Sequence, residues 1–179
     1  MKTQTKPIDA KAYNDALHEP GVEFVDGEIR EKDMSAVSSE LAATISAKLH
    51  AANRLKACRF YAEMSYRCFA DDPMRFRKPD VSVVLRSRLH DTEPEDGFFA
   101  FAPDLAIEFI SPSESAYDVD QKISDYLANG FGLIWVVYPK SKSVVEYSGK
   151  LQRTLRDTDE LVAPTILPEF SCKVSELFE

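Results

Sequence analysis

The stretch that most constrains the fold is PDLAIEFISPS, residues 103–113. From Leu105 to Ile110 the side chains are apolar except for Glu108, so the segment is typical of a strand within a protein core. Burial of an unpaired carboxylate costs several kcal/mol even after relaxation. Glu108 therefore requires a partner, which could be a cation, a protonated neighbour or a metal ion.

Periodicity and turn residues predict the other elements along the chain. Helices are expected after Asp9, ending at Pro20-Gly21, and over 38–53 with Ser38 or Ser39 as cap; a third begins at Ser115 and ends at Gly130. Its apolar stripe comprises Val119, Ile123, Tyr126 and Leu127. Strands are expected over 60–69, 78–85, 105–110 and 132–139, with hairpins over 22–32 and 142–156. The polar residues 86–98 are expected to form a mobile loop, and a short segment closes the chain.

This element order predicts an α/β or α+β domain with a mixed sheet flanked by helices. The 179 residues, 44% apolar and 29% charged, are expected to form a single domain, residues 1–179. The N-terminal sequence has no signal-peptide pattern and no window suits a membrane span, so we expect a cytoplasmic protein. Three widely spaced cysteines suggest neither disulfides nor a zinc site.

The net charge of the chain is unfavourable for a protein whose main task is to bind DNA through its phosphates. The formal charge is -8 and the isoelectric point is about 5.0. A local basic patch, or a divalent metal in an acidic site, would still permit nucleic-acid binding.

Two carboxylates are expected to meet on one surface of the sheet. Glu108 shares its strand face with the small Ala106, and Asp80 lies on the Ser82 side of its own strand. Sequential strands are neighbours about two-thirds of the time. Carboxylates that share a partly buried place need a cation or a proton between them, and Mg²⁺ fits that need.

Lys122 and Glu40 are two further candidates. Lys122 lies at the flank of the apolar stripe of its helix, from where its ammonium can reach a carboxylate and stabilise charge on a phosphate. Glu40 stands in the first turn of its helix. Structural alternatives remain open: a salt bridge from Glu108 to Lys122 or an arginine, a strand start at Asp80, a surface position for Lys122, and an ordinary helix acid at Glu40.

The sequence resembles the Uma-type family of putative restriction endonucleases, within the PD-(D/E)XK nuclease superfamily. The resemblance runs from about residue 10 to the end. It rests on six blocks in order: VDGEIREK, MSAVSSELAATISAKL, RFRKPDVSVV, PDLAIEFISPSES, DQKISDYLANGFGLIWVVYP and LPEFSCKVSELF.

The resemblance implies a restriction-endonuclease-like fold and a site that binds Mg²⁺ or Mn²⁺. Asp80 matches the aspartate of the PD motif and Glu108 the second acid; both would ligate the metal, with the Phe109 carbonyl as an extra ligand. Position 110, where many superfamily members have lysine, is isoleucine here, and Lys122 matches the lysine that other members carry on the next helix. Two additional acidic positions match Glu40 and Glu63.

The expected function is therefore a Mg²⁺-dependent endonuclease that hydrolyses DNA, with a homodimer expected because two-strand cutting usually needs two active sites. One departure is Leu41, where the family often has histidine. Some superfamily members have lost activity, so a catalytically inactive module that binds protein or nucleic acid is the alternative. An active DNA nuclease should gather arginines near Lys122, and the candidates are Arg75, Arg77, Arg86 and Arg88. A glycosidase that uses Asp80 and Glu108 as acid and base finds no support, because no aromatic sugar platform is evident.

Overall fold

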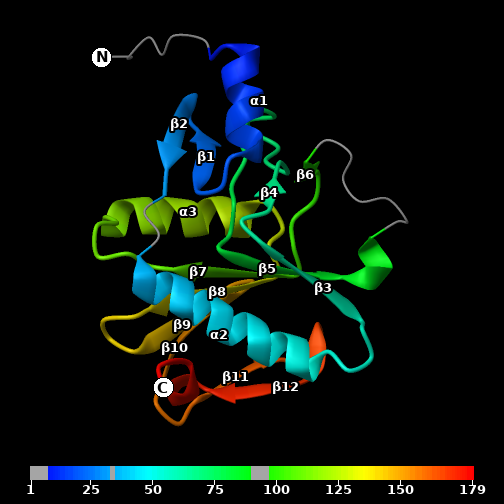
Figure 1. Ribbon diagram of the computed structural model, residues 1–179, viewed down its shortest axis with the longest axis vertical. Coiled ribbons are helices and arrows are strands. Elements are labelled where there is room, and N and C mark those ends of the chain that lie inside the picture. Colours follow the sequence, from blue (N-terminus) through cyan, green and yellow to red (C-terminus); the bar gives the residue numbers. More distant parts are fainter. Residues whose placement is uncertain (1–7, 33–34, 90–96) are drawn as a thin grey trace.

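A computed structural model describes residues 8–32, 35–89 and 97–179 of the chain. A six-stranded mixed sheet forms its centre, in the order β10-β9-β8-β7-β5-β3 (Figure 1). The strands are β3 (Cys58–Ala62), β5 (Val81–Leu85), β7 (Leu105–Phe109), β8 (Leu133–Tyr138), β9 (Ser143–Ser148) and β10 (Leu151–Arg156). Within this sheet β7 and β8 pair in parallel, and the other neighbouring strands are antiparallel. The expected α+β architecture with a mixed sheet is confirmed.

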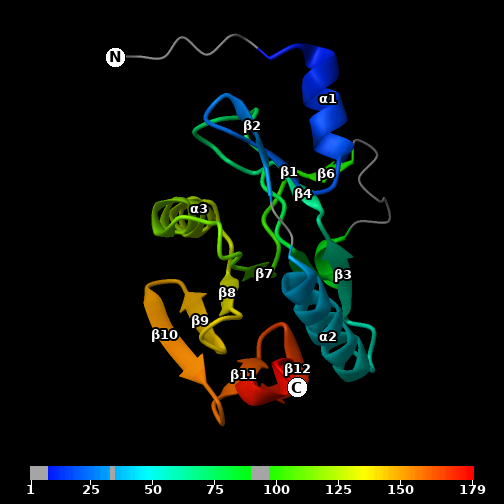
Figure 2. The ribbon, with the colours of Figure 1, turned by 60° about the vertical axis from the view of Figure 1, so that its left-hand side comes forward.

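Helices cover both faces of this sheet (Figures 1 and 2). Helix α3 (Ala116–Ala128) connects the parallel strands β7 and β8 and packs on one face through Val119, Ile123 and Tyr126. Helix α2 (Ala36–Ala52) covers the other face together with the β11 (Glu160–Ala163) and β12 (Leu167–Lys173) pair and the terminal 3-10 helix η2 (Val174–Leu177). Alternate side chains of β5 and β7 therefore pack into two separate hydrophobic cores, one on each face of the sheet.

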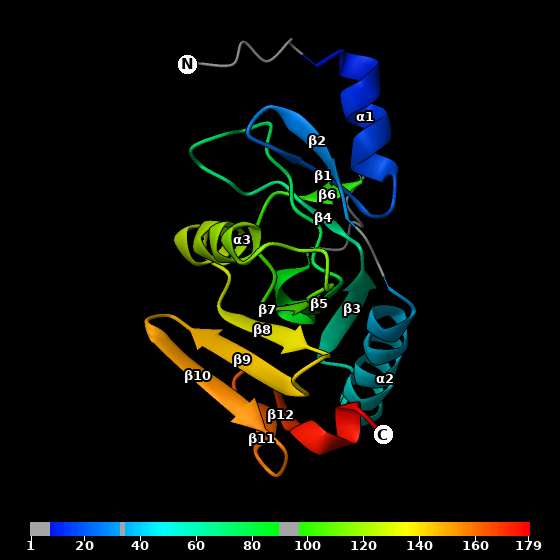
Figure 3. The ribbon, with the colours of Figure 1, turned by 90° about the vertical axis from the view of Figure 1, so that its left-hand side faces the viewer.

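The N-terminal elements lie on the α3 side of the sheet (Figure 3). Helix α1 (Ala10–His18), capped by Asp9, packs against the hairpin of β1 (Val22–Val25) and β2 (Glu28–Glu31) in a third apolar cluster with Phe76. The buried Lys78 donates hydrogen bonds to the carbonyls of Ala16 and Glu19, so a cation satisfies the C-terminal end of α1. This contact holds the end of α1 beside the segment that leads into β5.

The structure corrects several details of the sequence analysis. The strand expected over 60–69 divides into β3 and β4 (Ser65–Tyr66), because Glu63 adopts a left-handed backbone with φ 51°. The cap of α2 is Ser35 rather than Ser38 or Ser39, since the Ser35 side chain accepts from the Ser38 amide. Leu127 is 38% exposed and lies outside the buried stripe of α3.

The polar segment after β5 is only partly described. It begins with the short 3-10 helix η1 (Arg86–Arg88) and ends in β6 (Phe98–Phe99), which pairs in parallel with β4. Residues 90–96, within the expected loop, lie outside the described residues. No helix in the described ranges is long and apolar enough to cross a membrane.

Candidate metal centre

The register of β5 against β7 brings Asp80 and Glu108 together. Val81 pairs with Ile107, so the next position along the antiparallel ladder places Asp80 opposite Glu108. The Asp80 carboxylate also accepts a hydrogen bond from the Phe109 amide at 2.7 Å. Both acids are buried, with 6% of Asp80 and 2% of Glu108 exposed. The predicted meeting of these two side chains on one sheet surface is what the structure shows.

Glu108 has two close partners, both from α3. Its Oε2 accepts from the ammonium of Lys122 at 3.0 Å, and its Oε1 accepts from the hydroxyl of Tyr126 at 2.6 Å. Burial raises the pKa of Glu108, and the nearby ammonium groups of Lys122 and Lys32 offset part of this rise. Burial opposes the charge on Lys122, but Glu108 and Glu23 outweigh it and raise the lysine's pKa. Lys122 is therefore a buried ammonium and not a surface residue.

Lys32 is a central member of the site that the sequence analysis missed. Its Nζ donates to Asp80 Oδ1 and to the Lys78 carbonyl, each at 2.6 Å, and lies 3.6 Å from Glu108 Oε2. Burial opposes its charge, but the surrounding carboxylates raise its pKa well above the ordinary value. Lys32 is the last residue of the predicted hairpin and directly follows β2, and its amide extends the β1–β2 ladder by donating to the Gly21 carbonyl at 2.7 Å. Sequence alone shows it as one more charge in a polar run.

Glu63 completes a ring of three acids around the Lys32 ammonium. Its Oε1 lies 3.7 Å from Lys32 Nζ, and its Oε2 accepts from the Gly21 amide at 3.0 Å. Although Oε1 is buried, it has no hydrogen-bond partner among the described residues. Burial raises the pKa of Glu63; Lys32 lowers it in part, while nearby Asp80 raises it further.

Glu23 on β1 is a second acid that the sequence analysis did not single out. Its carboxylate lies 3.6 Å from Lys122 Nζ and accepts from Arg77 at 3.1 Å and from the Lys78 amide at 2.9 Å. Burial disfavours its charge, but these cations and the amide prevail and lower its pKa to about 2. Arg77 also donates a hydrogen bond to Asp125 of α3. Glu23 therefore connects Lys122 to the Arg77–Asp125 ion pair.

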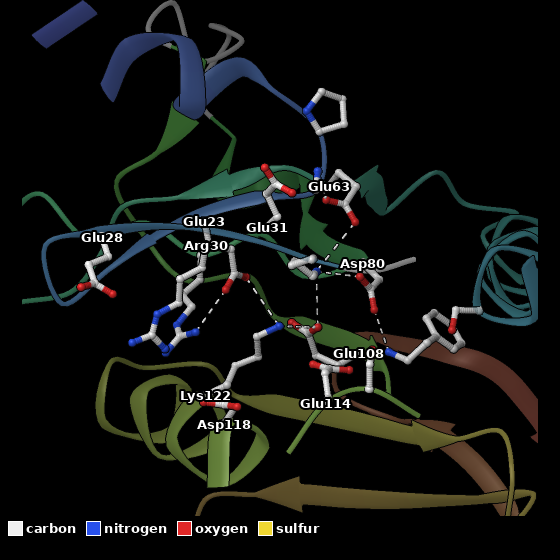
Figure 4. Close-up of a pocket in the computed structure, with 17 residues that line it drawn as sticks. Glu23, Glu28, Arg30, Glu31, Glu63, Asp80, Glu108, Glu114, Asp118 and Lys122 are labelled. Carbon is white, nitrogen blue, oxygen red and sulfur yellow. Dashed lines mark hydrogen bonds and ion pairs between the residues drawn. The ribbon is translucent and has the colours of Figure 1, made fainter. Parts of the chain in front are cut away.

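These side chains line a pocket of about 850 Å³ between the hairpin, the ends of β5 and β7, and the start of α3. Figure 4 shows Glu63, Asp80 and Glu108 directed towards one another, with Lys122 entering from α3. Of the residues that line the pocket, eight carry carboxylates and four carry cationic groups. An acidic cavity of this kind favours cationic ligands and disfavours a bare phosphate.

Other sequence candidates lie away from this centre. Glu40 is exposed on α2 and does not line the pocket. Arg77 lines the pocket but is engaged by Glu23 and Asp125, and buried Arg75 pairs with Asp26, Asp71 and Asp125. Arg86 and Arg88 follow the far end of β5, where Arg88 pairs with Asp104 at 2.9 Å. The arginine rim expected of an active DNA nuclease is therefore not formed by these four residues: Arg77 lines the pocket and Arg75 is buried, both within ion pairs, and Arg86 and Arg88 lie at the other end of β5.

The acids present suit a hard divalent cation. Asp80, Glu108 and Glu63 supply oxygen ligands of the kind that Mg²⁺ and Mn²⁺ take, and they already converge on one cationic nitrogen, that of Lys32. Phe109, whose carbonyl is the expected extra ligand, also lines the pocket. In the described ranges no three acidic, histidine or cysteine side chains stand in metal-ligand geometry. The Lys32 ammonium occupies the point on which Asp80, Glu108 and Glu63 converge.

Comparison with known families decides where the chain belongs. Residues 11–175 match the Uma2 family, described as "Putative restriction endonuclease". The chain belongs to the Uma2 family. This match includes Lys32, Asp80, Glu108 and Lys122, so the whole centre lies inside the family's domain.

Solved structures support the same fold for this Uma2 protein. A crystal structure of a putative nuclease belonging to DUF820, from Anabaena variabilis ATCC 29413, superposes with a TM-score of 0.76 and 24% identity. The superposition covers 89% of this chain and 90% of the other. No curated protein gives a significant sequence match.

Proposed function

We propose that this protein is a metal-dependent endonuclease that hydrolyses phosphodiester bonds in DNA. One observation supports it most: Asp80 and Glu108 stand opposite each other on adjacent strands, and Lys122 lies 3.0 Å from Glu108. Membership of a family described as putative restriction endonucleases agrees with this chemistry. The acidic pocket is compatible with DNA if a divalent cation offsets its charge.

Asp80, Glu108 and the Phe109 carbonyl would hold Mg²⁺ or Mn²⁺, with Glu63 as an additional acid. Bound there, the metal would polarise the phosphate and lower the pKa of a coordinated water. Lys122 stays protonated in this pocket, so its ammonium can orient the attacking water and stabilise negative charge on the phosphate. Tyr126 and Glu23 keep Glu108 and Lys122 in place, since each bonds or pairs with one of them.

The test is cleavage of supercoiled and linear DNA, single- and double-stranded, with Mg²⁺, Mn²⁺ or EDTA. Wild-type protein should nick or cut DNA only with metal, and Glu108→Gln should lose at least about 100-fold in rate while its circular dichroism is unchanged. Glu169→Gln, which changes an exposed acid of β12, is the matched control and should keep full activity. Equal rates for Glu108→Gln and wild type would reject the proposal.

Two observations favour a second candidate, a non-catalytic nuclease-like module that binds protein or nucleic acid. Lys32 already forms ion pairs with the acids of the site, and the four arginines do not form a rim for DNA. This candidate predicts no cleavage under any metal condition.

A homodimer would supply the two active sites that two-strand cutting requires. Light scattering after size-exclusion chromatography would measure the mass of the particle, to be compared with 20.2 kDa for one chain.

A further inference from the structure

We propose that Lys32 is a resident cation that holds the place of the divalent metal, so that the metal binds only as the Lys32 ammonium leaves. The inference rests on the proposed metal site but not on DNA cleavage. It assigns Lys32 a role in setting metal affinity, and it makes the hairpin that carries Lys32 responsive to metal.

The first argument is that every carboxylate oxygen of Asp80 and Glu108 accepts a hydrogen bond while Lys32 is in place. Asp80 Oδ2 accepts from the Phe109 amide and Oδ1 accepts from Lys32. Glu108 Oε1 accepts from Tyr126 and Oε2 from Lys122, with Lys32 3.6 Å away. Of the interactions around Asp80 and Glu108, the Lys32 ammonium is the one that all three acids share.

The second argument is electrostatic. An ammonium and a divalent ion that used the same oxygens would stand only a few ångströms apart, and like charges at that distance repel strongly in a buried site. Lys122 differs, because Glu23 offers it a second carboxylate at 3.6 Å, away from Asp80. The three ion pairs of Lys32, with Asp80, Glu108 and Glu63, are all with acids of the proposed metal site.

The third argument is that the Lys32 side chain can move its ammonium out of the site. Its side chain is 15% exposed, against 3% for Glu108, and it lines the pocket together with the acids. A lysine stem with four rotatable carbons can swing its ammonium into solvent or towards Glu31 and Glu114, which line the same pocket. The Glu63 oxygen that lacks a hydrogen bond would then gain a ligand.

Mn²⁺ titration by calorimetry tests the inference directly. Lys32→Gln should bind Mn²⁺ at least about tenfold more tightly than wild type, because no resident cation has to be displaced. The matched control is Lys48→Gln, which removes a lysine of α2 that pairs with Glu176 of η2, and it should bind as wild type does. Equal or weaker binding by Lys32→Gln would overturn the inference, as would no binding by either protein.

A second measurement needs only the wild-type protein, and so holds even if Lys32→Gln does not fold. Acylation by an N-hydroxysuccinimide ester, quantified by mass spectrometry, should modify Lys32 slowly without metal and at least about fivefold faster with Mn²⁺. Lys48 serves as the internal standard and should react at one rate in both conditions. An unchanged Lys32 rate with Mn²⁺ at saturation would overturn the inference.

The outcomes separate this inference from the proposed nuclease. Tighter binding by Lys32→Gln together with metal-dependent acylation supports it, even if no DNA is cut. A different outcome would be metal-dependent DNA cleavage by the wild type together with unchanged Mn²⁺ affinity in Lys32→Gln. It would support the proposed nuclease function and overturn the proposed role of Lys32.

Discussion

Lys122 Nζ lies 3.0 Å from Glu108 Oε2, and both side chains are almost fully buried. A pair of this kind is not a surface salt bridge, because each charge depends on the other for solvation that water cannot supply. Its energetics can be measured without any substrate.

Lys122→Met should destabilise the fold by roughly 3 kcal/mol, because it leaves the buried Glu108 carboxylate with one ammonium fewer. The double variant Lys122→Met with Glu108→Leu should recover part of that loss, since no unpaired charge then remains. Urea unfolding followed by circular dichroism gives the free energies of unfolding. If the losses of the two single variants simply add in the double variant, the residues are not coupled.

Acid should remove a stabilising contribution of Glu23. Its pKa is about 2 in the folded protein, below the ordinary value of 4.5, so the unfolded chain takes up this proton first as pH falls. The contribution is fully present above about pH 4.5 and disappears as pH approaches 2. The shift corresponds to about 3 kcal/mol.

Glu23→Gln should therefore be less stable than wild type at pH 7, and the gap should narrow as pH falls from 4.5 towards 2. Chemical denaturation across this window measures the gap. A gap that stays constant with pH would contradict the assignment of this shift to Glu23.

The cysteines should react slowly in the native protein. Burial raises the pKa of the Cys58 thiol, and it raises those of Cys68 and Cys172 to about 11. At pH 8 a thiol with pKa 11 is roughly 0.1% ionised, against about 10% at the ordinary value of 9.0. Labelling with Ellman's reagent should be slow at pH 8 and reach three thiols only in denaturant. A thiol that reacts as fast as free cysteine would contradict this prediction.

Lys78→Met should loosen the N-terminal helix. The substitution leaves the carbonyls of Ala16 and Glu19 without this donor, at a cost of about 1–3 kcal/mol. Hydrogen exchange should accelerate at the amides of α1 and stay unchanged at those of α3. Lys48→Met, on α2, is the control. Uniform acceleration across the chain would instead indicate global destabilisation.

Local signals in the sequence anticipated most elements. The Asp9 and Ser115 caps, the turn at Asp26-Gly27 and the alternation in β5 and β7 act over a few residues, so the chain specifies them without its tertiary context. The break at Glu63 was missed because a left-handed backbone at a glutamate has no local signature. The Ser35 cap was missed because several nearby serines suit that role.

For the site, sequence determined that a carboxylate within an apolar strand must have a partner, and it identified Asp80 and Lys122 as candidates. Those inferences follow from strand alternation and helix spacing. Only the tertiary structure decided that Lys32 and Glu23 join them and that Glu40, Arg86 and Arg88 do not. The reason is physical: a charged side chain at the edge of a hairpin is ordinary in sequence, and its partners exist only when the hairpin packs against the ends of β5 and β7.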